Sequence, residues 1–256
     1  MKSTRRTFLK IVGLSLLGIG AKPVFEGLAG GEDAKVIKAP EALGAKRWAM
    51  VVNPKKCPSG CKDCIEACHR VHNVPDFGNP KDEIKWIWNE PFKDAFPSQE
   101  HPYIEESQKE RPVIVLCNHC DNPPCVRVCP TKATFKRKED GIVMMDYHRC
   151  IGCRFCVAGC PYEARSMNYR DPRPFVKGIH PDFPTRTKGV VEKCNFCVER
   201  LARGLLPACV MACKEKALVF GDMENPKSVV RDLLRANFTI RRKPELGTNP
   251  QVYYIV

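Results

Sequence analysis

The sequence predicts an α+β fold in which short antiparallel strands and short helices are joined by long loops that carry cysteines. Two observations predict this class. The 16 cysteines of the 256-residue chain fall into four groups of four, and short segments with strand or helix character flank these groups. In chain order the groups are Cys57, Cys61, Cys64 and Cys68; Cys117, Cys120, Cys125 and Cys129; Cys150, Cys153, Cys156 and Cys160; and Cys194, Cys197, Cys209 and Cys213.

Cysteines grouped in this way form disulfides, bind structural zinc or hold iron-sulfur clusters. Disulfide frameworks are typical of short secreted chains that cannot bury a core, whereas 256 residues can bury one. Zinc is a stronger alternative, because two C-x2-C pairs supply four thiolates at tetrahedral geometry. The choice therefore depends on the spacing within each group.

The spacing of the third group favours iron-sulfur clusters. Its pattern, C-x2-C-x2-C-x3-C-P, places three thiolates on one tight loop, where they can hold three corners of a 4Fe-4S cluster while the fourth reaches a second cluster. The proline recurs after the second group, as Cys129-Pro130. We therefore predict that the 16 cysteines hold four 4Fe-4S clusters.

The other groups depart from this spacing. In the second group Pro123-Pro124 widen one gap, and we expect them to stiffen it into an extended path. In the fourth group eleven residues separate the second and third cysteines, and we expect a helical turn that ends at Gly204. In the first group a turn at Pro58 and Gly60 would absorb one extra residue.

Histidines near the cysteine groups are the other candidate ligands: His69, His72, His119 and His148. Because every group already supplies four thiolates, we expect these side chains beside the clusters or at the surface rather than bound to metal. The first group is the least regular, so His69 is the reserve ligand if that group does not hold a regular cluster.

The groups also form an internal repeat. The second and third groups predict one two-cluster ferredoxin-like unit at residues 112–187. The first and fourth groups predict an outer unit, residues 46–111 and 188–256, which the inserted unit splits. The expected elements are strands at 47–52 and 112–116, a hairpin at 134–145 that turns at Asp140-Gly141, a helix at 227–236 and a strand at 251–256.

An aromatic insertion, residues 69–111, follows the first group. Its aromatic side chains are Trp86, Trp88, Phe92 and Phe96. They could cover a pair of clusters or form a docking surface, since aromatic residues are enriched at protein interfaces. We favour the covering role.

The N-terminal residues 1–30 are expected to be an export signal or a membrane anchor. Residues 4–10, TRRTFLK, match the twin-arginine signal, and the apolar residues 11–21 follow them. As a helix these eleven residues would reach about 16 Å, against about 30 Å of hydrocarbon, so they do not span a membrane alone. The alternative is an amphipathic or buried N-terminal helix with a chance arginine pair.

The net charge of +13 would ordinarily suggest a nucleic-acid partner. Four clusters, each with about two negative charges when oxidised, would reduce it to about +5. We therefore expect no nucleic-acid partner, and we interpret the basic runs 136–138 and 241–243 as solvated surfaces. The sequence holds no G-x-S-x-G, dinucleotide or P-loop motif, so we expect an electron carrier without a catalytic site of its own.

The four groups, together with KCNFCVERLARGLLPACVMAC and RRKPELGTNPQVYYIV, resemble the four-cluster iron-sulfur subunits of the DMSO reductase and NrfC type over residues 46–256. More narrowly, CHRVHNVPDFGNPKDEIKWIW and the N-terminal segment are similar to the DsrO family, the exported iron-sulfur subunits of DsrMKJOP membrane complexes. The resemblance implies that paired groups exchange one ligand. The implied ligand sets are Cys57, Cys61, Cys64 and Cys213; Cys68, Cys194, Cys197 and Cys209; Cys117, Cys120, Cys125 and Cys160; and Cys129, Cys150, Cys153 and Cys156.

The resemblance also implies partners and a location. The partners would be an NrfD-like, quinone-reactive membrane subunit (DsrP-like) and a multihaem cytochrome c (DsrJ-like), in a complex linked to sulfite and sulfur metabolism. The chain would be exported folded by the twin-arginine route to the extracytoplasmic face of the membrane. The alternatives are a subunit of another periplasmic reductase or hydrogenase with a molybdopterin partner, and a zinc-stabilised binding module.

Overall fold

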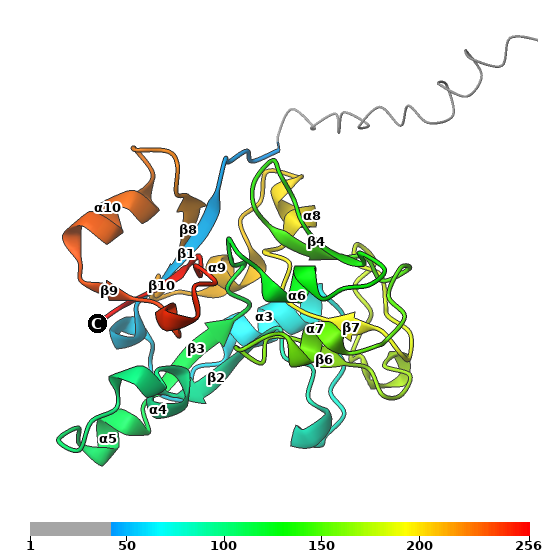
Figure 1. The fold of residues 1–256 in the computed structure, drawn as a ribbon, viewed down its shortest axis with the longest axis horizontal. Coiled ribbons are helices and arrows are strands. Elements are labelled where there is room, and N and C mark those ends of the chain that lie inside the picture. Colours follow the sequence, from blue (N-terminus) through cyan, green and yellow to red (C-terminus); the bar gives the residue numbers. More distant parts are fainter. Residues whose placement is uncertain (1–41) are drawn as a thin grey trace, which may run out of the picture. The chain divides into compact units, whose positions relative to one another are not determined.

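The computed structural model describes residues 42–256, whose fold is shown in Figure 1. The predicted N-terminal signal or anchor lies outside the described residues. Within residues 42–256, no helix combines the length and the apolar character that crossing a membrane requires. The helices are α3 (Asp63–Val71), α4 (Phe92–Ala95), α5 (Glu106–Lys109), α6 (Pro124–Arg127), α7 (Phe155–Ala158), α8 (Val198–Leu201), α9 (Ala208–Ala212) and α10 (Val229–Ala236), with 3-10 turns at Pro54–Lys56, Pro80–Asp82, Pro97–Gln99, Arg173–Phe175 and Pro244–Leu246.

The largest sheet has four strands in the order β8-β1-β10-β9. Their bounds are β1 (Trp48–Val52), β8 (Leu218–Asp222), β9 (Thr239–Ile240) and β10 (Val252–Ile255). The strands expected at 47–52 and 251–256 are thus confirmed, as is the helix expected at 227–236. One pairing differs from the expected antiparallel arrangement, because β1 runs parallel to β10. These strands lie at opposite ends of the described chain, so no hairpin fixes their relative direction.

Strand β1 is buried on both faces, which explains its continuous run of apolar residues. On one face Ala49 and Val51 pack against Val230 of α10, which lies beside β8 and β1 (Figure 1). On the other face Met50 and Val52 join the main hydrophobic core. The sheet therefore separates the C-terminal helix from the region that holds the cysteines.

Three two-stranded ribbons complete the strand structure: β2 (Ile87–Pro91) with β3 (Pro112–Leu116), β4 (Thr134–Lys136) with β5 (Val143–Met145), and β6 (Ser166–Met167) with β7 (Val191–Glu192). The strand expected at 112–116 and the hairpin expected at 134–145 are confirmed. Gly141 in the hairpin turn has φ +73°, and a Cβ there would lie 1.6 Å from Arg47 Nη1. Only glycine fits both conditions.

The aromatic side chains of the insertion pack in or against the main core: Trp86, Trp88, Phe92 and Phe96. Trp86 stacks on His72, with ring centroids 4.4 Å apart, and His72 Nδ1 lies 3.6 Å from Cys68 Sγ. Trp86 thus shields the surroundings of a cysteine, as the covering role predicts. Phe96 packs edge-on against Tyr254 of β10, so this part of the insertion covers the sheet instead.

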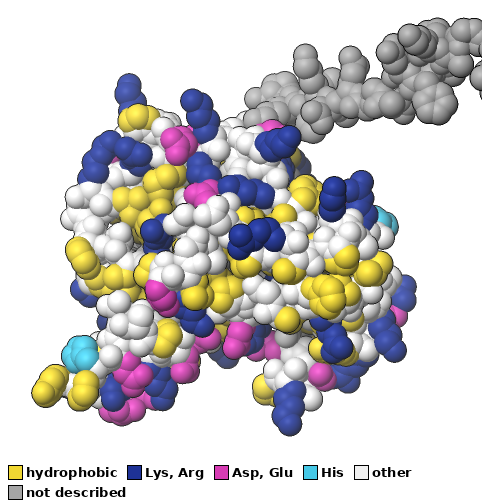
Figure 2. Space-filling model, in the orientation of Figure 1, with side chains coloured by type: hydrophobic (Ala, Val, Ile, Leu, Met, Phe, Trp, Pro, Cys, Tyr) yellow, Lys and Arg dark blue, Asp and Glu magenta, His cyan; other side chains and the backbone are white. Residues whose placement is uncertain are grey.

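Basic side chains are scattered over the face seen in Figure 2. In the run 136–138, Lys136 forms an ion pair with Asp121 at 2.9 Å. The run 241–243 is not the solvated surface that we expected, because Arg242 is 2% exposed and its Nη2 lies 2.7 Å from Glu90 Oε2. A charge pattern alone did not reveal this pair, since its members are far apart in the sequence.

Candidate metal centres

Helices α3 and α9 bring the first and fourth cysteine groups together. Acidic Asp63 and Glu66 in the first turn of α3 suit the positive end of its dipole. The buried face of α3 carries Cys64 and Cys68, one turn apart. Helix α9 carries Cys209 and packs against α3, so thiols that are about 140 positions apart in the sequence become neighbours.

We call Cys57, Cys61, Cys64 and Cys213 site 1. These four residues line one cavity of about 400 Å³, and His69 is not among its lining residues. The turn expected at Pro58 and Gly60 forms, with the Cys61 amide donating to the Pro58 carbonyl. Burial raises the pKa of Cys64 to about 12, and the nearby Cys57 and Cys213 thiolates raise it further. A shared cavity lined by four thiols suits a group that binds all four.

We call Cys68, Cys194, Cys197 and Cys209 site 2. All four thiols are buried. Burial raises the pKa of Cys68 well above its ordinary value, and the thiolates of the other three residues act in the same direction. Such a cluster of buried thiols favours binding of a cationic metal centre, which holds the sulfur atoms as thiolates.

The loop of site 2 has the backbone shape that directs amides at sulfur. Phe196 and Cys197 both have φ +54°, a left-handed conformation that is uncommon for side chains of this kind. The Phe196 amide donates to Cys194 Sγ at 3.4 Å, and the Ala208 amide donates to Cys197 Sγ at 3.4 Å. Helix α8 follows, and Gly204, with φ +74°, lies just after its end, as the spacing predicted.

We call Cys117, Cys120, Cys125 and Cys160 site 3. Burial raises the pKa of Cys120 to about 12, with a further contribution from Cys117. Burial also raises the pKa of Cys160 to about 11, and the Cys117 and Cys125 thiolates add to this effect. Cys160 of the third group therefore lies with three cysteines of the second group. Pro123 is extended as expected, whereas Pro124 begins α6, because proline suits the first helical position.

We call Cys129, Cys150, Cys153 and Cys156 site 4. Cys129 and Cys150 pack against the small apolar cluster that includes Cys156. Burial acts to raise the pKa of Cys129, but hydrogen bonds, first that from the Thr134 amide, hold it below its ordinary value. Cys153 is half-buried on the same loop as Cys150.

The four sites follow one another in numerical order. Three pairs of thiols from neighbouring sites lie close enough for their charges to interact: Cys64 with Cys209, Cys117 with Cys194, and Cys125 with Cys156. Sites 1 and 4, at the ends of this row, each have three half-buried cysteines, whereas all four cysteines of site 2 are buried. The row therefore has a shielded interior and two ends closer to solvent.

Two buried cations lie beside the row. Arg165 is 4% exposed, and its Nη2 donates to Cys125 Sγ at 3.1 Å. Lys193 is 1% exposed, and its Nζ donates to the Cys194 carbonyl. Within residues 42–256, neither cation forms an ion pair with a carboxylate. Burial acts to lower the pKa of Arg165, but the surrounding thiolates, Cys125 first, raise it above its ordinary value. A buried charge requires a counter-charge, so both cations suit an anionic group held by the thiols.

The chain resembles known iron-sulfur proteins over almost its whole length. A family model described as a 4Fe-4S dicluster domain matches residues 113–173 and 181–223. The chain is 38% identical to the Hdr-like menaquinol oxidoreductase iron-sulfur subunit 1 of Archaeoglobus fulgidus, over 98% of the chain and 97% of the relative. It is 39% identical to the NrfC homolog of Haemophilus influenzae, over 98% and 94%. The chain belongs to the NrfC-type family of 4Fe-4S iron-sulfur subunits. It is also 37% identical to a subunit of the tetrathionate reductase of Salmonella typhimurium, over 100% and 89%.

As an NrfC-type subunit, the chain is an electron carrier that binds 4Fe-4S clusters. The family agrees with the broader of the two resemblances that the sequence indicated, whereas the narrower DsrO assignment stays a prediction. The residues present fit such clusters, because all 16 cysteines are free thiols and the buried Arg165 lacks a carboxylate. Of the histidines, His119 is buried against Phe196 and His148 is exposed, so their surroundings are those expected of residues that do not bind metal.

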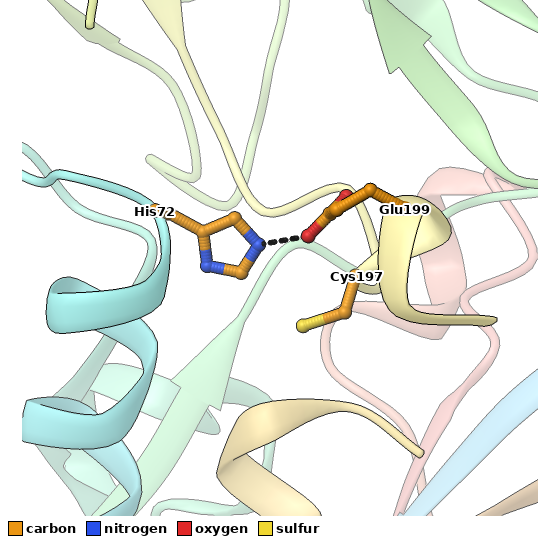
Figure 3. A group of neighbouring side chains, drawn as sticks. All are labelled: His72, Cys197 and Glu199. Atoms are coloured by element: carbon orange, nitrogen blue, oxygen red, sulfur yellow. Dashed lines mark hydrogen bonds and ion pairs between the residues drawn. The ribbon is translucent and has the colours of Figure 1, made fainter. Parts of the chain in front are cut away.

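A mononuclear metal site is the alternative that the geometry itself raises. The ligand atoms of His72, Cys197 and Glu199 all lie within 4.8 Å of one another (Figure 3). However, His72 Nε2 already contacts Glu199 Oε1 at 2.8 Å, and Cys197 lies with Cys209 and the other thiols of site 2. The NrfC-type assignment therefore places Cys197 in a cluster, with His72 and Glu199 as its neighbours.

Sequence reasoning did not identify the polar residues that surround the sites: Arg165, Lys193, Glu199 and, as a partner of Glu199, His72. Glu199 hydrogen-bonds His72 across 127 positions of the chain. Arg165 reaches Cys125 across 40 positions. The one local signal is the position of Arg165, five residues after the last cysteine of the third group. That signal does not reveal that the side chain is buried.

Proposed function

We propose that this NrfC-type chain carries four 4Fe-4S clusters, one in each of sites 1 to 4, and relays electrons along the row that they form. The observation that carries the proposal is the approach of neighbouring sites through Cys64 and Cys209, Cys117 and Cys194, and Cys125 and Cys156. The clusters would supply the one-electron chemistry. The chain would hold them by thiolates, exclude water from the middle of the row, and expose its ends to partners.

The ligand sets that we propose are those of the four sites. Support comes from Cys213, which shares a cavity with cysteines of the first group, and from Cys68, which lies beside cysteines of the fourth. Cys160 lies beside cysteines of the second group in the same way. In this arrangement each pair of groups exchanges one ligand, and residues 112–187 act as a two-cluster unit inserted into an outer one.

The proposed partner is an NrfD-like, quinone-reactive membrane subunit. Support comes from the relative in Archaeoglobus fulgidus, whose name describes an iron-sulfur subunit of a menaquinol oxidoreductase. We further propose a multihaem cytochrome c as a second partner, in a Dsr-type complex of sulfur metabolism, and twin-arginine export to the extracytoplasmic face. These finer proposals derive from the sequence resemblance.

A second candidate is the iron-sulfur subunit of another reductase. It is favoured by the similarity to the tetrathionate reductase subunit, which covers the whole chain. Anaerobic purification of the native membrane complex would separate the candidates. A co-purifying multihaem cytochrome c, with clusters reduced by a menaquinol analogue, supports the Dsr-type complex. A molybdopterin protein in place of the cytochrome supports the second candidate.

A zinc-stabilised binding module is the candidate from a different class. It predicts a colourless chain that contains about four zinc ions and shows no electron paramagnetic resonance (EPR) signal after reduction. Metal analysis of the anaerobically purified chain distinguishes it directly. Iron and acid-labile sulfide in equal amounts support the proposed function, whereas stoichiometric zinc would contradict it.

A further inference from the structure

Arg165 lies beside the two sites of the inserted segment, just before β6. Its Nη2 donates to Cys125 Sγ at 3.1 Å and to Thr134 Oγ1 at 2.6 Å, and its Nη1 lies 3.8 Å from Met145 Sδ. The guanidinium charge also acts on Cys156 of site 4. Its surroundings are thus sulfur atoms and one hydroxyl.

Arg165 differs from the other buried arginines in its partner. Four arginines within residues 42–256 are buried: Arg47, Arg165, Arg186 and Arg242. Three of them form an ion pair with a carboxylate, namely Arg47 with Asp121, Arg186 with Glu192 and Arg242 with Glu90. Arg165 forms none within the described chain and faces a cysteine of site 3 instead. The thiolates of a bound cluster are therefore its available counter-charge.

A fixed positive charge at this position has a consequence for electron transfer. A cluster becomes more negative by one charge when it accepts an electron, and hydrogen bonds to sulfur and nearby charge are among the factors that set its reduction potential. In a buried place the charge is weakly screened. Arg165 therefore stabilises the reduced form more than the oxidised form.

We propose that Arg165 raises the reduction potential of the cluster in site 3 and, to a smaller extent, that of the cluster in site 4. This inference depends on the proposed function, since it requires clusters in both sites. Arg165 acts here by positioning charge and a hydrogen-bond donor at Cys125. Reduction adds one electron to a cluster, with dithionite as the donor in the test, and no bond of the chain forms or breaks.

The effect should be confined to one half of the row. Site 2 has a different environment, in which the neighbouring polar groups are the His72 and Glu199 pair. Site 1 opens into its own cavity, and Arg165 is not among the residues that line it. Removal of Arg165 should therefore leave the potentials of sites 1 and 2 unchanged.

The test is an anaerobic redox titration of the holo protein, followed by EPR, on Arg165→Gln and Arg165→Lys. Arg173→Gln is the matched control, because Arg173 is exposed and pairs with Asp171 at the surface. Iron and sulfide are counted first in each protein. We expect unchanged iron content, and in Arg165→Gln at least a tenfold loss in the reduction equilibrium of one cluster, which corresponds to about 59 mV for one electron.

A second cluster should shift by less, two should not shift, and Arg165→Lys, which keeps the charge, should lie between wild type and Arg165→Gln. Four unchanged potentials at full iron content would overturn the inference. Loss of a cluster from both Arg165 variants would also overturn it, because Arg165 would then be a structural residue. Fewer than about sixteen irons in the wild-type chain would instead count against the proposed function.

Discussion

His72 Nε2 lies 2.8 Å from Glu199 Oε1, which joins the end of α3 to the start of α8 beside site 2. His72 Nδ1 lies 3.0 Å from the Cys68 carbonyl, which can only accept, so Nδ1 carries a proton. Asn195 Nδ2 donates to the second oxygen of Glu199 at 2.9 Å. The pair therefore links the first and fourth cysteine groups through a hydrogen-bonded network.

Truncation of Glu199 should weaken the fold. Glu199→Ala leaves the buried His72 and the Asn195 amide without their shared acceptor, at an expected cost of about 1–3 kcal/mol. The measurement is the thermal unfolding midpoint of the holo protein. Asp182→Ala is the control, since Asp182 forms an exposed ion pair with Arg203 that should contribute about 1 kcal/mol or less. Equal midpoints for the two variants would contradict a structural role for the network.

Two glycines allow conformational strain to be separated from steric clash. Gly141 and Gly178 both have φ +73°, but a Cβ at Gly178 would meet no atom within 4 Å, whereas at Gly141 it would collide with Arg47. Gly178→Ala should therefore cost about 1 kcal/mol from strain alone, and Gly141→Ala should cost clearly more. Thermal unfolding of both variants gives the comparison. An equal loss would mean that Arg47 moves aside freely.

Ligand exchange between groups can be tested by pairs of cysteine substitutions. If Cys57 and Cys213 hold the same cluster, Cys57→Ala, Cys213→Ala and the double variant should each lose about four irons. If each group instead holds its own cluster, the double variant should lose about eight. The readout is iron content per chain after anaerobic purification. The corresponding pair for site 3 is Cys117 with Cys160.

Removal of the clusters should destabilise the chain, and Arg165 should contribute to the loss. Thiols without iron are largely neutral near pH 7, so the buried Arg165 would then lack a counter-charge. Chelation under anaerobic conditions should lower the unfolding midpoint of the wild type, and should lower that of Arg165→Met by less. Circular dichroism before and after chelation measures both differences. An identical drop in the two proteins would show that Arg165 needs no anion.

The local patterns of the sequence predicted the local structure. The continuous apolar run in β1, the turn at Gly141 and the periodicity of α10 each depend on residues within a few positions of one another. The cysteine spacing predicted the chemistry for the same reason, because three ligands lie on one loop. These features were therefore visible before any tertiary structure was known.

Features that depend on distant residues were not visible in the sequence. The parallel pairing of β1 with β10 joins Met50 to Val252, and no turn connects the two strands. The burial of Arg242 follows from its ion pair with Glu90, 152 positions away. The environments of Arg165 and His72 arise in the same way, from contacts that only the folded chain creates.

The central claim is that 16 cysteines hold four 4Fe-4S clusters in a row. Quantification of iron and acid-labile sulfide in the anaerobically purified chain, with EPR of the dithionite-reduced protein, tests it most directly. We predict about sixteen irons and sixteen sulfides per chain, with a broadened spectrum from interacting clusters. A colourless protein that contains zinc or disulfides, with no EPR signal on reduction, would contradict the claim.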